Sequence, residues 1–372
     1  MSDASPKPQR VGLSLLGGPA RWPVLVVATV AVVLAYWWTL GNLLPESAGT
    51  DAPTSPARTT AMADLEAVEA ILETAQRAVK DNEFAKAETV LEAAVEQYPR
   101  DQALRLALGD LFVRMSQPVP EAKGHDPEPI PDEQRLALER RAYEQFVEAL
   151  RIGPRMPGTE FAAGSLARSL DNLDAAIAHF ESASTLDKAN ANYPLHLAQV
   201  YFARNELDAA NARLAVAVSL NPDLATAWGM MAEIALKQGS PRIALEHLER
   251  ATALEPREVA WRHMQARAYS RVGEPDKALA ALDALPEAER FSRTSLQLAG
   301  QALGLARRPE DALARYEQAL ESGVSDPQVY LDAATWAERL GKVERAGELA
   351  RTAAMADVPG ARRLLDRLEA KP

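Results

Sequence analysis

Alanine returns at a fixed interval along most of this chain. Seven alanines are spaced 34 residues apart, and an eighth precedes them by 55 residues, which is 21 more than the interval. They are Ala87, Ala142, Ala176, Ala210, Ala244, Ala278, Ala312 and Ala346. An interval of this length is typical of paired helices that stack as repeats and bury a continuous core only together. The chain is therefore constrained to a repeat array, with an insertion inside one repeat.

Two further positions of the repeat recur at the same interval as these alanines. The eighth position of each repeat holds a small residue: Ala75, Gly109, Gly164, Ala198, Ala232, Ala266, Gly300 and Ala334. Four residues after the alanine, seven of the eight repeats hold a large apolar residue: Leu91, Phe146, Phe180, Leu214, Leu248, Leu282 and Tyr316; the last repeat has Ala350. A side chain larger than alanine would hold two crossing helices apart, and the large residue fills the space beside the crossing. Each repeat is therefore predicted to be two antiparallel helices, A and B.

One repeat carries a longer motif. It reads Trp228, Gly229, Met230, Met231 and Ala232, and continues with Gly239, Ala244, Leu248, Ala251 and Pro256. This order resembles the tetratricopeptide repeat, W-x2-L-G-x2-Y, then A-x3-F, then P. The resemblance implies an all-α fold: a right-handed α-solenoid of about eight helix-turn-helix repeats over residues 62–360, closed by a capping helix at 361–372. The expected repeats are 68–101, 102–156, 157–190, 191–224, 225–258, 259–292, 293–326 and 327–360.

An apolar segment precedes the array. No charged residue occurs from Trp22 to Pro45, and a membrane-spanning helix needs about 20 predominantly apolar residues. Aromatic residues lie at both ends of the segment, as in interfacial belts. The sequence predicts a tail at 1–21, a transmembrane helix at 22–40 and a flexible linker at 41–61. A cleaved signal peptide is the alternative, but the apolar core is long and ends in aromatic residues. A buried core helix is a further alternative, for which the array offers no cavity.

The charges beside this segment predict its orientation. Lys7, Arg10 and Arg21 precede it, and only Arg58 follows closely. Positive residues stay on the cytoplasmic side, so we expect a single-pass protein with a cytoplasmic N-terminus. An Ala/Arg-rich composition favours a bacterial source. The repeats would then lie in the periplasm, held at the inner membrane.

The insertion at 117–133 contains five prolines, which favour an extended loop. Its polar residues are His125, Asp126, Glu128, Asp132 and Glu133. A single histidine with unevenly spaced carboxylates defines no metal geometry, so a solvated acidic loop or a partner contact is the better interpretation. Long loops that persist in compact proteins are often functional.

The resemblance also implies a concave wall, formed by the second, fifth, ninth, twelfth and thirteenth positions of each repeat. The candidate partner-binding residues on it are Gln199, Phe202, Glu233, Lys237, His263, Arg267, Arg271, Gln297 and Gln301. His263, Arg267 and Arg271 form a basic patch. Because arginine binds carboxylates through two parallel hydrogen bonds, the patch suits a partner's acidic side chain or C-terminus. Alternatively, these arginines pair with Glu233 or with acidic residues of neighbouring repeats.

Composition and motifs exclude several function classes. The chain has no cysteine and a net charge of −11, of which residues 61–372 contribute −12 and residues 1–60 contribute +1. An acidic array is a poor ligand for nucleic acid. The sequence contains no P-loop, dinucleotide-binding glycine pattern, H-E-x-x-H or G-x-S-x-G motif. We therefore expect no catalytic residue, no metal and no cofactor.

The favoured function is a membrane-anchored scaffold or adaptor. It would bind a protein partner in the concave groove and support assembly of an envelope or membrane complex. Anchoring raises the effective concentration of the groove near other membrane components. A holdase-type chaperone that presents client tails, as in c-type cytochrome maturation, is the alternative, and an enzyme is the least favoured one.

Overall fold

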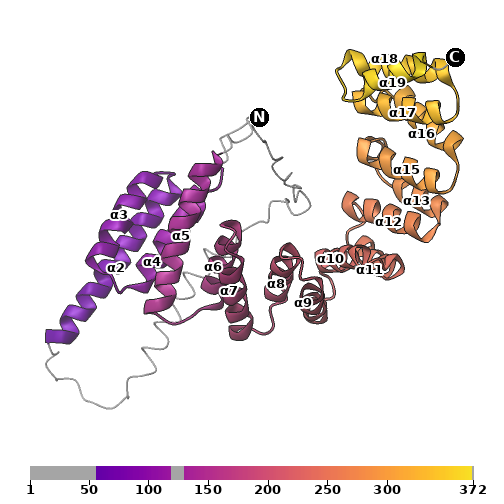
Figure 1. The fold of residues 1–372 in the computed structure, drawn as a ribbon. Coiled ribbons are helices and arrows are strands. Elements are labelled where there is room, and N and C mark those ends of the chain that lie inside the picture. Colours follow the sequence, from indigo (N-terminus) through magenta and orange to yellow (C-terminus); the bar gives the residue numbers. More distant parts are fainter. Residues whose placement is uncertain (1–55, 119–129, 371–372) are drawn as a thin grey trace, which may run out of the picture. The chain divides into compact units, whose positions relative to one another are not determined.

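A computed structural model describes residues 56–118 and 130–370, and these residues form 18 helices and no strand (Figure 1). The helices follow one another as antiparallel pairs, and in seven of the eight repeats the A helix packs on the B helix of its own repeat. The predicted all-helical solenoid is confirmed.

The helix bounds follow the repeat frame. The first four repeats consist of α2 (Pro56–Lys80) and α3 (Phe84–Gln97), α4 (Gln102–Met115) and α5 (Asp132–Ile152), α6 (Pro157–Ser169) and α7 (Leu173–Leu186), and α8 (Asn192–Ala203) and α9 (Leu207–Leu220). The last four consist of α10 (Ala225–Lys237) and α11 (Pro241–Leu254), α12 (Val259–Val272) with α13 (Pro275–Asp283) and α14 (Glu287–Arg290), α15 (Arg293–Leu305) and α16 (Pro309–Glu321), and α17 (Pro327–Arg339) and α18 (Val343–Met355). Helix α19 (Ala361–Glu369) follows them. The seven packed pairs are α2 on α3, α4 on α5, α6 on α7, α10 on α11, α12 on α13, α15 on α16 and α17 on α18.

The described residues divide into two compact bodies, one that ends at Arg213 and one that begins at Leu214, with the boundary inside α9. We call them the N-terminal body and the C-terminal body and describe each by itself. The N-terminal body holds α2 to α8, and the C-terminal body holds α10 to α19.

The small residues lie where the repeat pattern predicts close packing. All eight alanines of the 34-residue column are fully buried. The glycines at the eighth position face the large residue of the same repeat. A Cβ added to Gly109 would lie 2.9 Å from the ring of Phe146, and one added to Gly164 would lie 2.8 Å from the ring of Phe180. Each aromatic ring thus occupies the space that a larger side chain would need.

The A–B turns share one backbone conformation. The fifteenth position has a positive φ in seven repeats: Asn82, Asp171, Asn205, Gly239, Gly273, Arg307 and Gly341. After all seven of these positions, the next amide donates back across the turn, as in Ser240 N to Ala235 O at 2.8 Å, which completes a Schellman-type cap. Glycine occupies only three of these seven positions. Asparagine and aspartate also tolerate this conformation. The positive φ is therefore shared by more repeats than have glycine at this position.

Repeat 6 departs from the helix pair. Its B segment is split into α13 and the four-residue α14. Pro286 follows α13 and cannot donate a helical hydrogen bond. Leu285 occupies the twenty-seventh position of its repeat, where the other repeats have alanine. It is 3% exposed and fills the core at the break.

Two helices begin earlier than the sequence predicted. Helix α2 begins at Pro56, so residues 56–61, which were assigned to the flexible linker, are helical. Proline is favoured in the first turn of a helix because its missing N–H has no partner there. Helix α5 begins at Asp132, inside the predicted insertion, with Asp132 and Glu133 in a first turn where the helix dipole favours acidic residues. His125, Asp126 and Glu128 lie outside the described residues.

None of the helices within residues 56–118 and 130–370 is both long and apolar enough to cross a bilayer. The predicted span, Trp22 to Leu40, and the preceding tail lie outside the described residues. Helix α19 closes the other end of the array: Ala361, Leu364 and Leu368 are buried against α17 and α18, and Arg367 Nη2 lies 2.9 Å from Glu338 Oε2.

Gly229 offers a test of the packing inside the C-terminal body. A Cβ at this position would overlap the ring of Trp261, which is 8% exposed. We expect Gly229→Ala to lower the free energy of unfolding by about 1–3 kcal/mol, because overpacking displaces a buried ring. The matched control is Gly347→Ala on α18, where the nearest atom lies 3.6 Å away on the flexible Arg351. The control should gain about 0.5–1 kcal/mol from helix propensity. Urea unfolding followed by circular dichroism measures both, and equal gains would contradict this account.

Candidate functional site

Two of the predicted site residues, Gln199 and Phe202, lie on α8 in the N-terminal body. Gln199 Oε1 accepts a hydrogen bond from Arg168 Nη1 of α6 at 2.7 Å. Phe202 is partly buried. Burial lowers the pKa of Arg168, although the group remains charged at neutral pH. Gln199 therefore joins two A helices, a structural role that the sequence pattern did not indicate.

A histidine that the sequence analysis did not select lies beside Gln199. The ring of His196 stacks 5.6 Å from Phe180 and meets Phe161 edge-on at 4.8 Å. Its Nδ1 atom is buried and has no hydrogen-bond partner among the described residues. Burial, together with the charge of Arg168, lowers the pKa of His196 to about 4. The imidazole is therefore neutral at physiological pH and behaves as part of an aromatic cluster.

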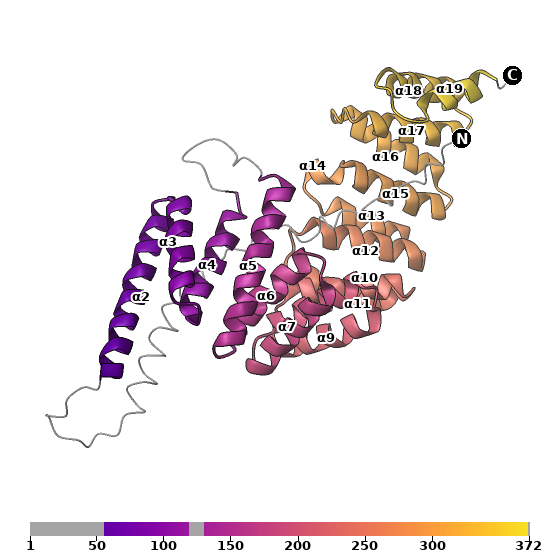
Figure 2. The same cartoon turned by 60° about the vertical axis from the view of Figure 1, so that its left-hand side comes forward.

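The other seven predicted residues lie in the C-terminal body, on helices that pack on one another in the order α10, α12, α15, α17 (Figure 2). We call the exposed side of these four A helices the A-helix face. Its predicted members are Glu233 and Lys237 on α10, His263, Arg267 and Arg271 on α12, and Gln297 and Gln301 on α15.

The two arginines of the basic patch differ in their contacts. Arg271 Nη1 donates to the carbonyl oxygen of Leu236, in the last turn of α10, at 2.5 Å. Arg267 is exposed and has no hydrogen-bond or ion-pair partner within the described residues. Among the described residues, neither arginine pairs with Glu233. Arg271 therefore connects two helices, while the guanidinium of Arg267 is available to a carboxylate.

His263 is held by the next repeat. Its Nε2 lies 2.8 Å from Ser295 Oγ, and that hydroxyl donates to the carbonyl of Glu289 at 2.6 Å. Since the hydroxyl hydrogen is used there, His263 acts as the donor to Ser295. Burial lowers the pKa of His263, and the nearby Glu289 opposes the shift. The basic patch therefore consists of two arginines beside a partly buried histidine.

Helix α15 contributes an uncharged strip to the A-helix face. Gln297 Nε2 donates to Asp332 Oδ2 of α17 at 3.2 Å, and Gln301 is exposed. The strip ends at Leu305, which is 66% exposed. Leu305 was absent from the predicted set, although it occupies the thirteenth position, which the resemblance assigns to the wall. By contrast, Leu236 at the twelfth position is 3% exposed and belongs to the core.

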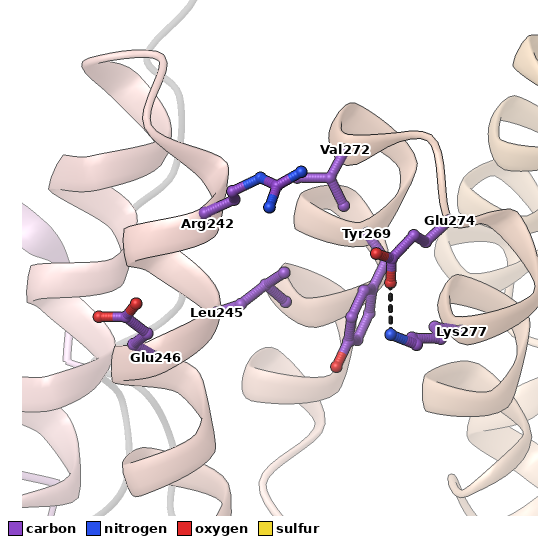
Figure 3. A pocket seen from close by; sticks show the side chains of 7 residues that line it. All are labelled: Arg242, Leu245, Glu246, Tyr269, Val272, Glu274 and Lys277. Atoms are coloured by element: carbon purple, nitrogen blue, oxygen red, sulfur yellow. Dashed lines mark ion pairs between the residues drawn. The ribbon is translucent and has the colours of Figure 1, made fainter.

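A cavity of about 320 Å³ lies between α11, the end of α12 and α13 (Figure 3). Its polar lining includes Arg242, Glu246, Tyr269 and an ion pair of 2.7 Å between Lys277 Nζ and Glu274 Oε2. None of the nine predicted site residues lines this cavity. Charges of both signs stand at its edge, so it does not select for one class of ligand.

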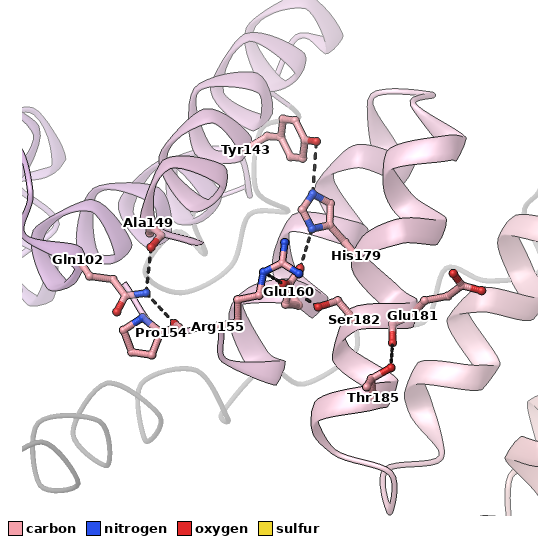
Figure 4. A network of polar contacts seen from close by, with 10 residues as sticks. All are labelled: Gln102, Tyr143, Ala149, Pro154, Arg155, Glu160, His179, Glu181, Ser182 and Thr185. Atoms are coloured by element: carbon pink, nitrogen blue, oxygen red, sulfur yellow. Dashed lines mark hydrogen bonds and ion pairs between the residues drawn. The ribbon is translucent and has the colours of Figure 1, made fainter. Parts of the chain in front are cut away.

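The N-terminal body contains a buried polar network (Figure 4). The carboxylate of Glu160 is fully buried; it accepts from His179 Nδ1 at 2.7 Å and from Ser182 Oγ at 2.8 Å, and lies 3.3 Å from Arg155 Nε. Tyr143 Oη lies 3.4 Å from His179 Nε2. Serine and histidine both contact the same carboxylate, and the serine does not contact the histidine. This arrangement generates no activated nucleophile; it joins α5, α6 and α7.

The described residues contain no group of three or more histidine, aspartate or glutamate side chains that could hold a metal ion. One carboxyl group has a strongly perturbed pKa. Burial raises the pKa of Asp110, on α4, to about 7. It has no hydrogen-bond partner in the part of the chain that the structure describes. A single perturbed acid without a base or nucleophile beside it does not form an active site.

Comparison with known proteins agrees with the repeat architecture. One family model described as tetratricopeptide repeat matches residues 167–234 and 235–301, and a second with the same description matches 72–114 and 298–368. Neither describes an enzyme. A search of curated proteins found no match.

Among solved structures, the chain is similar to YrrB, a TPR protein with an unusual peptide-binding site, at 17% identity and a TM-score of 0.44, over 54% of this chain and 96% of that one. It is similar to MamA at 22% identity and a TM-score of 0.42, over 44% and 90%. A tetratricopeptide repeat protein from Parabacteroides merdae matches at 16% identity and a TM-score of 0.44, over 64% and 94%. These similarities concern repeat architecture and identify no partner.

Proposed function

Because the chain is a tetratricopeptide-repeat protein, we propose that it is a membrane-anchored scaffold whose A-helix face binds an acidic segment of a protein partner. The apolar segment Trp22–Leu40 would hold it in the inner membrane of a bacterium, with the N-terminus in the cytoplasm and the repeats in the periplasm. There it would support the assembly of an envelope or membrane complex.

The observation that carries this proposal is the exposure of Arg267. Its guanidinium is exposed on the A-helix face without a described partner, in a protein whose net charge is −11. Arg271 lies one helical turn further on, within reach of the same ligand, and still has hydrogen-bond donors beyond the one that contacts Leu236. Two neighbouring guanidinium groups favour a carboxylate over a neutral or basic ligand.

Support for the anchor comes from the sequence. The segment from Trp22 to Pro45 lacks charge, and basic residues precede it, which together favour a span with a cytoplasmic N-terminus. Confinement to a membrane raises the local concentration of the array, so moderate affinity for a partner is sufficient.

A photo-crosslinking side chain at position 301, beside the basic patch, tests the proposal in membranes of cells that produce the protein. We expect it to form a covalent adduct with one acidic partner. Arg267→Glu should reduce the adduct about tenfold, since a repelled carboxylate costs at least the 1.4 kcal/mol that corresponds to that factor. Arg271 is kept because it also holds the end of α10.

The matched control is Arg242→Glu on α11, which changes the net charge equally and lies outside the A-helix face. The control should leave the adduct unchanged. Equal loss in both variants, or no loss in either, would refute a role for the A-helix face. Deleting residues 22–40 should release the protein from carbonate-washed membranes, and retention would refute the anchor.

A further inference from the structure

We infer that the A-helix face binds an extended segment of the partner protein in which two acidic residues, six positions apart, flank a central apolar residue. This inference rests on the proposed function and specifies the ligand of the same surface. It is carried by Arg267 and Arg271 on α12 and Arg339 on α17, with the uncharged strip of α15 between these two helices.

The strip on α15 is continuous and accessible. Thr294, Gln297, Gln301 and Leu305 are all exposed, and spacings of three, four and four residues place them on one side of a helix. None of them is charged. The two neighbouring A helices carry Arg267 and Arg271 on one side and Arg339 on the other, and α17 also carries Asp332, whose carboxylate accepts from Gln297 of the strip.

Arg339 is held in an orientation that suits a carboxylate. Its guanidinium carbon lies 4.6 Å from the ring centroid of Trp336, and the side chain is exposed without an ion-pair partner among the described residues. Stacking on an aromatic ring restrains the planar fork and leaves its N–H groups at the edge. Arg339 is therefore prepared to form two parallel hydrogen bonds with a second acidic residue.

The central position of the ligand faces apolar surface. The indole of Trp336 packs on α15, where a Cβ added to Gly304 would lie 2.9 Å from it and one added to Gly300 would lie 3.1 Å from its Nε1. Leu305 follows Gly304 directly and is 66% exposed. Leu305 on α15 and the partly buried Trp336, whose ring lies beside Arg339, thus supply apolar surface between Arg339 and the arginines of α12.

Helix geometry sets the spacing of the ligand. Packed helices lie about 8–10 Å apart, so α12 and α17, separated by α15, are about 16–20 Å apart. An extended chain covers about 3.3 Å per residue and spans this distance in about six residues. A helix rises about 1.5 Å per residue and would need about 12. The exposed amides of Gln297 and Gln301 favour the extended form, because its backbone N–H and C=O groups need partners and those of a helix do not.

The test uses the full-length protein in detergent and fluorescein-labelled peptides, with binding measured by fluorescence anisotropy. The reference peptide has the pattern Asp-Ser-Ser-Leu-Ser-Ser-Asp. We expect about tenfold weaker binding when the aspartates are four or twelve positions apart, and a similar loss when the central leucine becomes asparagine, since each change removes about 1.4 kcal/mol of contact.

A double-mutant cycle tests whether the second acidic residue of the peptide pairs with Arg339. Arg339→Gln should weaken the reference peptide severalfold and leave unchanged a peptide whose distal aspartate, the one opposite Arg339, is serine. Arg351→Gln, an exposed arginine on α18, is the matched control and should change neither. An equal effect of Arg339→Gln on both peptides would overturn the pairing.

The outcomes separate the two hypotheses. If acidic peptides bind equally at every spacing, or bind best at twelve, the inferred pattern is wrong and the acidic partner stands. If no acidic peptide binds, the proposed function is itself refuted. Preference for the six-residue spacing with loss of affinity in Leu305→Asn supports the inference.

Discussion

Replacing Asp110 with asparagine is expected to stabilise the N-terminal body at pH 8 by as much as roughly 4 kcal/mol, the free energy that corresponds to the shift in its pKa. Burial raises the pKa of this carboxyl from 3.8 to about 7 in the folded protein. The folded state therefore keeps a proton that the unfolded chain releases. The free energy of unfolding should fall as the pH rises from about 4 to about 7, and stay low above that.

Urea unfolding at pH 4.5 and pH 8 measures this effect. The variant should gain stability at pH 8 and little at pH 4.5, where Asp110 is already protonated. Glu96→Gln, at an exposed position on α3, is the control and should change neither value. His196 acts in the opposite direction: its pKa is lowered to about 4, so its contribution to stability is lost as the pH falls from about 6.5 through 4. A wild-type protein equally stable at both pH values, with no gain in Asp110→Asn, would contradict the burial of an unpaired carboxyl.

Phe180→Ala is expected to lower the free energy of unfolding by about 3–5 kcal/mol, the usual cost of removing a fully buried aromatic ring. Phe180 has no exposed surface, fills the space beside Gly164, and its ring centroid lies 5.7 Å from that of Phe161. Because the surrounding backbone is fixed by the alanine column, the cavity cannot collapse.

The control for this prediction lies on the same helix. Leu186, in the last turn of α7, is 46% exposed, and Leu186→Ala should cost less than about 1 kcal/mol because little apolar surface is lost. Urea unfolding followed by circular dichroism compares the two variants. If both substitutions had equal effects, the large residue of the repeat pattern would not be the packing element that we describe.

The fold could be predicted from the sequence because its constraint is local and repeated. Ala244 and Gly164 each allow close contact of two helix backbones. The same requirement for a small residue occurs in all eight repeats. Leu285 replaces the small residue that the other repeats have at this position, and the B segment of repeat 6 is broken beside it, which the repeat pattern did not predict. The start of α2 at Pro56 was missed, because a short polar segment with proline is compatible with a linker as well as with a helix.

The sequence says less about the candidate site, because position on a helix does not reveal what a side chain contacts. Gln199 and Arg271 occupy wall positions, yet one accepts a hydrogen bond from Arg168 and the other donates to the carbonyl of Leu236. These partners belong to other helices, 31 and 35 residues away in the chain. Leu305 and Leu236 both occupy positions that the resemblance assigns to the concave wall. Only the structure shows that Leu305 is exposed and that Leu236 is buried.

The sequence by itself determined the repeat: the paired helices of each unit and the small side chains that meet at each crossing. It could do so because steric exclusion between neighbouring helices depends on residue size at a fixed spacing. The tertiary structure decided which polar side chains are used within the protein and which are available to a partner. That distinction between Arg271 and Arg267 depends on hydrogen-bond distances between separate helices, which no local pattern encodes.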